Sequence, residues 1–137
     1  MNHELLRIKS YSLWDLFLHK DQYPYLGRCY VSAKREDARS VGDMTTKERE
    51  ELFGVIVPEW EIVIKVLFAH TRTNMDSLGN TYNHLRWHLI PRYKEPKHLF
   101  GIDFIDPNPS RNWSPYPKKD IPLETMIYIK DAIKSKL

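Results

Sequence analysis

The sequence has little cysteine, little net charge and no long apolar run. Its single cysteine, Cys29, has no partner for a disulfide within the chain. The formal net charge at pH 7 is only +3, and no run of five or more like charges is present to follow a nucleic-acid backbone. The longest mainly apolar stretch, 55–68, contains proline and charged residues and is shorter than the roughly 20 residues of a membrane span. We therefore expect neither a nucleic-acid partner nor a membrane-spanning segment.

The composition is otherwise that of an ordinary globular protein. Hydrophobic residues make up 42% and charged residues 28% of the 137 positions, which predicts one domain over residues 1–137. The start, Met1-Asn2-His3-Glu4, lacks the basic and apolar regions of a secretory signal. Together with the lone cysteine, this start predicts a cytoplasmic location.

The first half of the chain combines strand and helix patterns. Residues 14–18 alternate between apolar and other side chains, and 28–33 follow a turn-rich segment, so the two predict a β-hairpin. Thr45 and Glu48 have the spacing of a capping box, in which each side chain bonds the other residue's backbone amide. The apolar stripe that follows predicts a helix to about residue 68, with a kink at Pro58.

The second half begins with two extended segments, 70–77 and 82–91, around a turn at 78–80. The stretch 94–119 contains five prolines and predicts a long ordered loop. A C-terminal helix is expected next, with Pro122 near its start. The fold class predicted by these patterns is α+β.

The segment 83–91, Asn-His-Leu-Arg-Trp-His-Leu-Ile-Pro, is the most informative part of the sequence. In a strand, alternate side chains point to one face at intervals of roughly 6.6 Å. His84, Arg86 and His88 would then share a polar face, while the apolar residues between them face the core. Such a polar row would be available to a ligand.

A helical form of the same segment would place His84 and His88 one turn apart, as in a zinc site. The general-base glutamate expected after the first histidine is instead Leu85, Arg86 would lie beside the metal, and Pro91 would end the helix. We therefore favour the strand and expect no metal and no cofactor.

Asn74, the run Ser77-Leu78-Gly79-Asn80 and the segment 84–93 resemble the signature of the histidine triad (HIT) family, in which three histidines alternate with apolar residues. The resemblance covers roughly residues 12–93 and leaves 94–137 outside it. It implies a HIT-like antiparallel sheet of about five strands with a long helix, usually paired into a homodimer, that binds a nucleotide or nucleotidyl conjugate through phosphate.

The resemblance also assigns catalytic positions to His84, Arg86 and His88. In the family the middle histidine attacks the α-phosphate, the first orients it, and the third contacts phosphate or the leaving group. Arg86 stands at the nucleophile's position, and a guanidinium has no available lone pair at neutral pH. Its planar fork of donors is suited to holding phosphate instead.

Further phosphate contacts are expected from the turn before the strand, because Gly79 permits close backbone approach. The predicted nucleotide-binding residues are Asn74, Gly79, Asn80, Thr81, His84 and His88. Two functions stay open. One is hydrolysis at an α-phosphate by water, with His88 or His84 as base. The other is a catalytically silent regulator in which Arg86 holds phosphate.

Two more features have a binding and a structural interpretation. Arg92 could contact phosphate or pair with a surface acid, and the segment 111–116 could fold over a ligand or only anchor a loop. Lys20 and Glu36 lie near the places where many family members have a ribose-binding aspartate and a further histidine, and neither residue matches.

Overall fold

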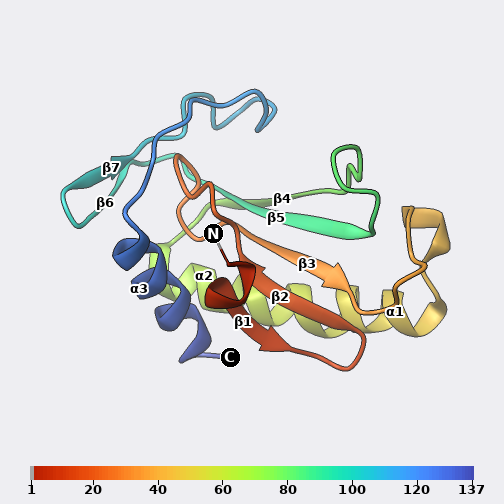
Figure 1. Ribbon diagram of the computed structural model, residues 1–137. Helices are drawn as coiled ribbons and strands as arrows, with labels where there is room; N and C mark the ends of the chain where they lie inside the picture. Colours follow the sequence, from red (N-terminus) through yellow and green to blue (C-terminus); the bar gives the residue numbers. More distant parts are fainter. Residues whose placement is uncertain (1) are drawn as a thin grey trace.

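The computed structural model describes residues 2–137 and consists of a twisted antiparallel sheet with helices (Figure 1). The order of the five main strands is β1-β2-β3-β5-β4. The strands are β1 (Arg7–Ser10), β2 (Trp14–Leu18), β3 (Cys29–Ala33), β4 (Arg72–Asp76) and β5 (Arg86–Arg92). A separate hairpin contains β6 (Lys97–Leu99) and β7 (Ile102–Phe104). The α-helices are α1 (Thr46–Glu51), α2 (Val57–Phe68) and α3 (Leu123–Lys134), and two short 3-10 helices span His3–Leu6 and Val41–Asp43.

The predicted hairpin is confirmed as β2 and β3, which pair antiparallel from Trp14 opposite Ala33 to Leu18 opposite Cys29. Strand β1 was not expected from the sequence. It is only four residues long, and its register with β2 shifts between Arg7 and Lys9, so the alternation that marks a strand is broken.

The capping box is confirmed, because Thr45 Oγ1 accepts from the Glu48 amide at 3.1 Å and Glu48 Oε1 accepts from the Thr45 amide at 2.8 Å. The predicted kink at Pro58 takes the form of a π-helical segment, Leu52–Ile56, which joins α1 to α2 without a break. Proline has no amide hydrogen and its ring crowds the carbonyl four residues earlier, and the wider π turn accommodates both effects.

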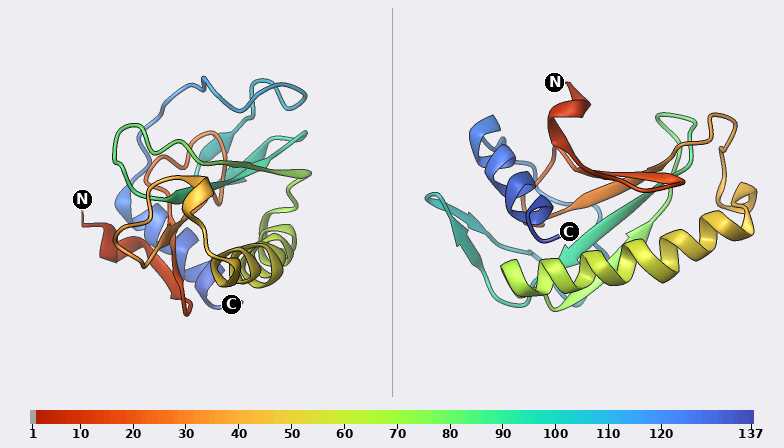
Figure 2. Two further views of the ribbon diagram at one scale, coloured as in Figure 1. Left: turned by 90° about the vertical axis from the view of Figure 1, so that its right-hand side faces the viewer. Right: turned by 90° about the horizontal axis from the view of Figure 1, so that it is seen from below.

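Helix α2 covers one face of the sheet (Figure 2). Its buried residues Trp60, Val63 and Ile64 pack in one core cluster with strand residues that include Val31 and Leu89. Because side chains alternate along a strand, residues 28, 30 and 32 of the β3 region and 86, 88 and 90 of β5 point to the other face. We call this other side the open face. Among residues 2–137, no helix has the length and apolar character needed to cross a membrane.

The predicted loop 94–119 is partly wrong, because β6 and β7 form a hairpin within it. Phe100 and Gly101 make the turn with positive φ of 49° and 74°. The rest, residues 105–119, crosses the open face, and we call it the strap. Its Trp113 packs with Tyr25, Ile90 and Tyr116 in a small cluster separate from the main core. The terminal helix is confirmed as α3, which begins directly after Pro122.

Candidate functional site

A single row of side chains crosses all five strands on the open face. Arg7 pairs with Phe17, Phe17 with Tyr30, Tyr30 with His88, and His88 with Asp76. Directly opposed residues of antiparallel strands share a face. The rings of Phe17 and Tyr30 stack with centroids 5.1 Å apart, and the Arg7 guanidinium lies 5.0 Å from the Phe17 ring. The row gives the open face a planar, partly cationic surface.

Arg86 lies next to this row, opposite Ser32 of β3. Its guanidinium carbon is 5.2 Å from the centre of the Tyr82 ring, and its Nη2 donates to the Tyr82 carbonyl at 3.4 Å. Its Nε is buried without a hydrogen-bond partner. Within the described chain the guanidinium forms no ion pair with a carboxylate, so its charge is not neutralised locally.

His88 is the centre of an aromatic group on the same face. Its ring lies 5.4 Å from His19, 6.3 Å from Tyr30 and 6.5 Å from Trp113, measured between centroids. Its Nδ1 is buried and has no partner within residues 2–137. Burial, followed by the charges of Arg28 and Arg86, lowers the pKa of His88 to about 4.

His19, at the end of β2, is affected in the same way. Burial, followed by the charges of Arg28 and His88, lowers its pKa to about 2. Its Nδ1 accepts from the Asp21 amide at 3.0 Å. At neutral pH both imidazoles are therefore uncharged, and the net positive charge of this group comes from arginine.

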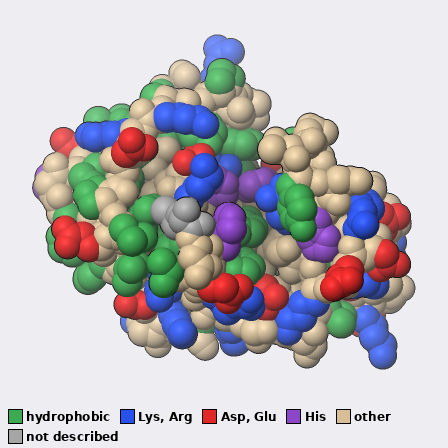
Figure 3. Space-filling model, in the orientation of Figure 1, with side chains coloured by type: hydrophobic (Ala, Val, Ile, Leu, Met, Phe, Trp, Pro, Cys, Tyr) green, Lys and Arg blue, Asp and Glu red, His purple; other side chains and the backbone are tan. Residues whose placement is uncertain are grey.

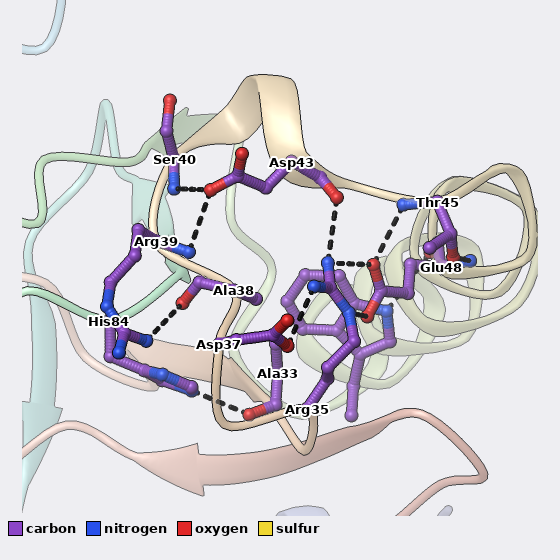
Figure 4. Close-up of polar contacts among 11 residues, drawn as sticks. Ala33, Arg35, Asp37, Ala38, Arg39, Ser40, Asp43, Thr45, Glu48 and His84 are labelled. Atoms are coloured by element: carbon purple, nitrogen blue, oxygen red, sulfur yellow. Dashed lines mark hydrogen bonds and ion pairs between the residues drawn. The ribbon is translucent and has the colours of Figure 1, made fainter.

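His84 is placed differently from the prediction. Strand β5 begins at Arg86, so His84 lies in a bend before it. Its Nε2 donates to the Ala33 carbonyl at 2.6 Å, and the next amide, that of Leu85, donates to the Ala38 carbonyl at 3.1 Å. Figure 4 shows the ring directed toward the loop after β3. The Nδ1 lone pair is left available, and the role of His84 in orienting a group at position 86 stays a prediction.

The loop after β3, toward which His84 points, is held by several hydrogen bonds of its own (Figure 4). Arg35 donates to both carboxylate oxygens of Glu48, at 3.2 and 3.0 Å, and to the Asp43 carbonyl at 2.7 Å. Asp43 in turn accepts from the amides of Arg39 and Ser40. These bonds link the end of β3 to the start of α1 and fix the carbonyl that His84 contacts.

The other predicted phosphate ligands lie at two places. Gly79 has a φ of +65°, a conformation that favours glycine, and the neighbouring Asn80 and Thr81 are exposed. Asn74 lies opposite Ile90, and its Oδ1 accepts from Arg92 Nη1 at 2.9 Å. The structure thus brings Arg86 and His88 together, places His84 at their edge, and ties Asn74 to Arg92.

Arg92 has the structural role that the sequence left open, although its partner is buried. It donates to both carboxylate oxygens of Asp106, at 2.7 and 3.1 Å. It also donates to the backbone carbonyls of Asn108 and Arg111, each at 2.7 Å. These bonds fasten the beginning of the strap to β5.

Arg28 is the site residue that sequence analysis missed. It directly precedes β3 and is only 3% exposed, yet it forms no ion pair with a carboxylate in the described chain. Its guanidinium carbon lies 5.0 Å from the Trp113 ring and 5.2 Å from the Tyr116 ring. The only sequence signal was its position in phase with Tyr30 and Ser32, on the face opposite to the apolar side chains of β3.

The strap covers one end of this face. Trp113 Nε1 donates to Asp76 Oδ2 at 3.1 Å, and the Tyr25 hydroxyl donates to the Trp113 carbonyl at 2.5 Å. The segment 111–116 is therefore anchored and also lies beside His88. Figure 3 shows histidine side chains gathered near the middle of the molecule's front, with basic side chains close by.

Several hollows of the molecule lie elsewhere. One of about 370 Å³ is lined by residues of α2 and the segment before β4, including Glu61, Lys65 and His70. Another, of about 390 Å³, lies between α2, β6 and α3. We base the candidate site on its chemistry rather than on cavity shape, because the hollow beside α2 is shallow and its cations, Lys65 and Arg72, are not buried.

No protein-family model and no curated protein matches the chain, whereas solved structures do. A histidine triad protein from Sinorhizobium meliloti 1021 matches with a TM-score of 0.75 and 20% identity, covering 100% of this chain and 96% of that one. One from Marinobacter aquaeolei VT8 gives 0.72 and 19%, covering 100% and 95%. Plasmodium falciparum diadenosine triphosphate hydrolase gives 0.64 and 15%, covering 96% and 76%.

These identities are low, so the likeness establishes the fold. The chain has the HIT fold, as its sequence signature predicted, and the likeness extends through residues 94–137, which the sequence resemblance did not reach.

Proposed function

We propose that this HIT-fold protein binds a nucleotide through its phosphate on the open face, with Arg86 and His88 as the central contacts. The observation that supports the proposal most is the Arg86 guanidinium, which lacks a carboxylate partner in residues 2–137 and lies on the same face as His88, a histidine kept neutral. A guanidinium in this state offers a fork of donors that matches phosphate oxygens.

The low pKa of His88 should respond to a bound phosphate. The pKa of His88 is low because of burial and two neighbouring guanidinium charges. A bound phosphate would offset those charges and raise the pKa of the imidazole, so binding would be accompanied by partial protonation of His88. A protonated His88 would then donate a charge-assisted hydrogen bond to the phosphate.

Turnover, in this proposal, proceeds without a covalent intermediate. Arg86 cannot attack phosphorus, so water would attack the α-phosphate and give its proton to His88 in its neutral form, while Arg86 stabilises the charge that develops on the phosphate oxygens. The bond from the α-phosphorus to the leaving group breaks, the leaving group takes up a proton, and a nucleoside monophosphate is released. The second candidate is a silent nucleotide-binding regulator, favoured by the arginine at the nucleophile position.

Binding is tested by isothermal titration of AMP into wild type, Arg86→Met and the control Arg49→Met, which removes an exposed arginine of α1. Charge-assisted hydrogen bonds contribute about 1.5–3 kcal/mol, so Arg86→Met should weaken AMP binding by about 10- to 150-fold. Arg49→Met should bind as wild type does. Equal affinities in all three proteins would reject the proposed site.

Turnover is tested by AMP release from an adenosine phosphoramidate and a diadenosine polyphosphate, with wild type and Arg86→His in parallel. Release by wild type that disappears in His88→Ala supports hydrolysis by water. A silent wild type with an active Arg86→His supports the regulator. A silent pair that still binds AMP shows that other parts of the catalytic site are missing.

We also propose that the protein is a homodimer. Ile62 and Val66 of α2 are each 66% exposed, beside the edge strand β4. Glu61, Lys65 and Arg72 border the same surface, so two copies could pair opposite charges around an apolar centre. Light scattering should give the mass of a dimer for wild type and of a monomer for the double variant Ile62→Asp, Val66→Asp. A monomeric wild type would contradict the proposal.

A further inference from the structure

Arg28 has an unusual environment for a buried cation. Within residues 2–137, its only side-chain hydrogen bond is from Nη1 to the Tyr116 hydroxyl, at 2.9 Å. Its Nε is buried and unpartnered, and its Nη2 has no hydrogen-bond partner among the described residues. A buried charge without a counter-ion is strongly unfavourable. The folded protein therefore holds a guanidinium whose donors are mostly unused.

The position of Arg28 relates it to the proposed phosphate site. Arg28 lies four residues before Ser32, the partner of Arg86, which corresponds to about 13 Å along an extended chain. Tyr30 and its partner His88 lie midway between the two. Both guanidinium charges act on the His88 imidazole, where each contributes to the lowered pKa. The two arginines therefore approach one histidine from opposite directions along the strands.

The strap holds Arg28 in place rather than neutralising it. The rings of Trp113 and Tyr116 lie 5.7 Å apart with an interplanar angle of 30°, and both contact the guanidinium as cation–π partners. Trp113 is fixed by Tyr25 and Asp76, and the Tyr116 hydroxyl also donates to Asp21 at 3.4 Å. Aromatic contacts orient the cation and leave its other donors for an anion.

We propose that Arg28 binds a second anionic group of the ligand, so that the site prefers a nucleotide with a further phosphate beyond the α-phosphate over a nucleoside monophosphate. This inference rests on the proposed function, since the α-phosphate is the group assigned to Arg86. The groups available to the second phosphate are the donors of Arg28 that have no partner among the described residues.

The test compares ADP and AMP, titrated without divalent metal into wild type, Arg28→Met and the control Arg49→Met. Wild type and the control are expected to bind ADP at least tenfold more tightly than AMP, because a charge-assisted hydrogen bond contributes about 1.5–3 kcal/mol. In Arg28→Met the ratio of the ADP affinity to the AMP affinity should fall to about one. Arg28→Gln, which keeps a polar side chain, serves as a second variant if the first does not fold.

The outcomes separate this inference from the proposed function. An ADP preference that persists unchanged in the Arg28 variants overturns the role of Arg28 but not the phosphate site. A wild type that binds AMP and ADP equally also overturns the role of Arg28 and leaves the phosphate site in place. A wild type that binds neither nucleotide rejects the proposed function and this inference together.

Discussion

Arg28 and Arg92 are equally buried, at 3% exposure each, yet their surroundings are opposite. Arg92 forms an ion pair with Asp106 in which two nitrogens meet two oxygens, and it donates to three further acceptors. The side chain of Arg28 forms one hydrogen bond with the described residues, to the Tyr116 hydroxyl. Burial alone therefore does not distinguish a structural arginine from one available for binding. The number of satisfied donors and the presence of a counter-ion do.

The largest expected effect comes from Arg92→Met. Removing one partner of a buried ion pair leaves the other charge uncompensated, which destabilises proteins by about 3–5 kcal/mol. Here Asp106 would keep only the hydrogen bond from the Asn108 amide, and the carbonyls of Asn108 and Arg111 would each lose a hydrogen bond from a charged donor. Urea unfolding, followed by circular dichroism, should show a free energy of unfolding lower by about that amount.

The matched variant is Arg28→Met, which removes the same side chain from an equally buried position. Because no carboxylate is left unpaired, the free energy of unfolding should stay within about 1 kcal/mol of wild type or rise. If both variants lose about the same stability, Arg28 is a structural residue and the contrast between the two sites fails.

A second prediction concerns acid, since His19 and His88 are neutral in the folded protein and their folded-state pKa values lie below the ordinary 6.5. Between pH 6.5 and about 4 the unfolded chain binds more protons than the folded one. Stability is therefore fully present above pH 6.5 and falls with decreasing pH, by up to about 1.4 kcal/mol per pH unit for each histidine. Unfolding measured from pH 7 to pH 4.5 checks this.

The control for this prediction compares the substitution of a buried histidine with that of an exposed one. His88→Gln should make the stability profile less steep over that range, whereas His98→Gln, which changes an exposed ring that contacts Asp103, should not make it less steep. Identical slopes in wild type and His88→Gln would show that His88 is not held neutral by burial and its two neighbouring arginines.

A third, smaller effect is expected for Arg35→Met. Arg35 pairs with Glu48, whose side chain is buried, but Arg35 itself is partly exposed and the carboxylate keeps its bonds to Thr45. The free energy of unfolding should fall by clearly less than it does in Arg92→Met, because water screens a partly exposed pair. A loss as large as that of Arg92→Met would mean that the loop around His84 is as essential as the start of the strap.

These arginines also show how far the sequence alone could lead. Alternation predicted β2, β3 and β5, and the Thr45 and Glu48 pattern predicted the start of the long helix, because both signals depend on near neighbours. The short β1 and the hairpin β6–β7 were missed, since strands of three or four residues carry too little pattern. The strand face shared by Arg86 and His88 followed from period-two spacing.

What the sequence could not supply were contacts between distant segments. Arg28 depends on Tyr116, which lies 88 residues later, and Arg92 depends on a carboxylate in the segment that was predicted as a long ordered loop. His84 departs from the strand face because the Ala33 carbonyl, 51 residues earlier, binds its ring. No local rule indicates which side chain a distant segment will cover.

The last prediction tests the one side-chain hydrogen bond that Arg28 forms with the described residues. Tyr116→Phe removes the hydroxyl that accepts from Arg28 and keeps the ring beside the guanidinium. Because a hydrogen bond to a charged group contributes about 1.5–3 kcal/mol and the cation–π contact is retained, thermal unfolding should reveal a loss of no more than about 3 kcal/mol. The ADP preference should persist, since the donors assigned to the second phosphate do not include that bond. A loss of several kcal/mol would show that this one bond carries the Arg28 charge, so that Arg28 resembles Arg92 after all and has no unmet need for an anion.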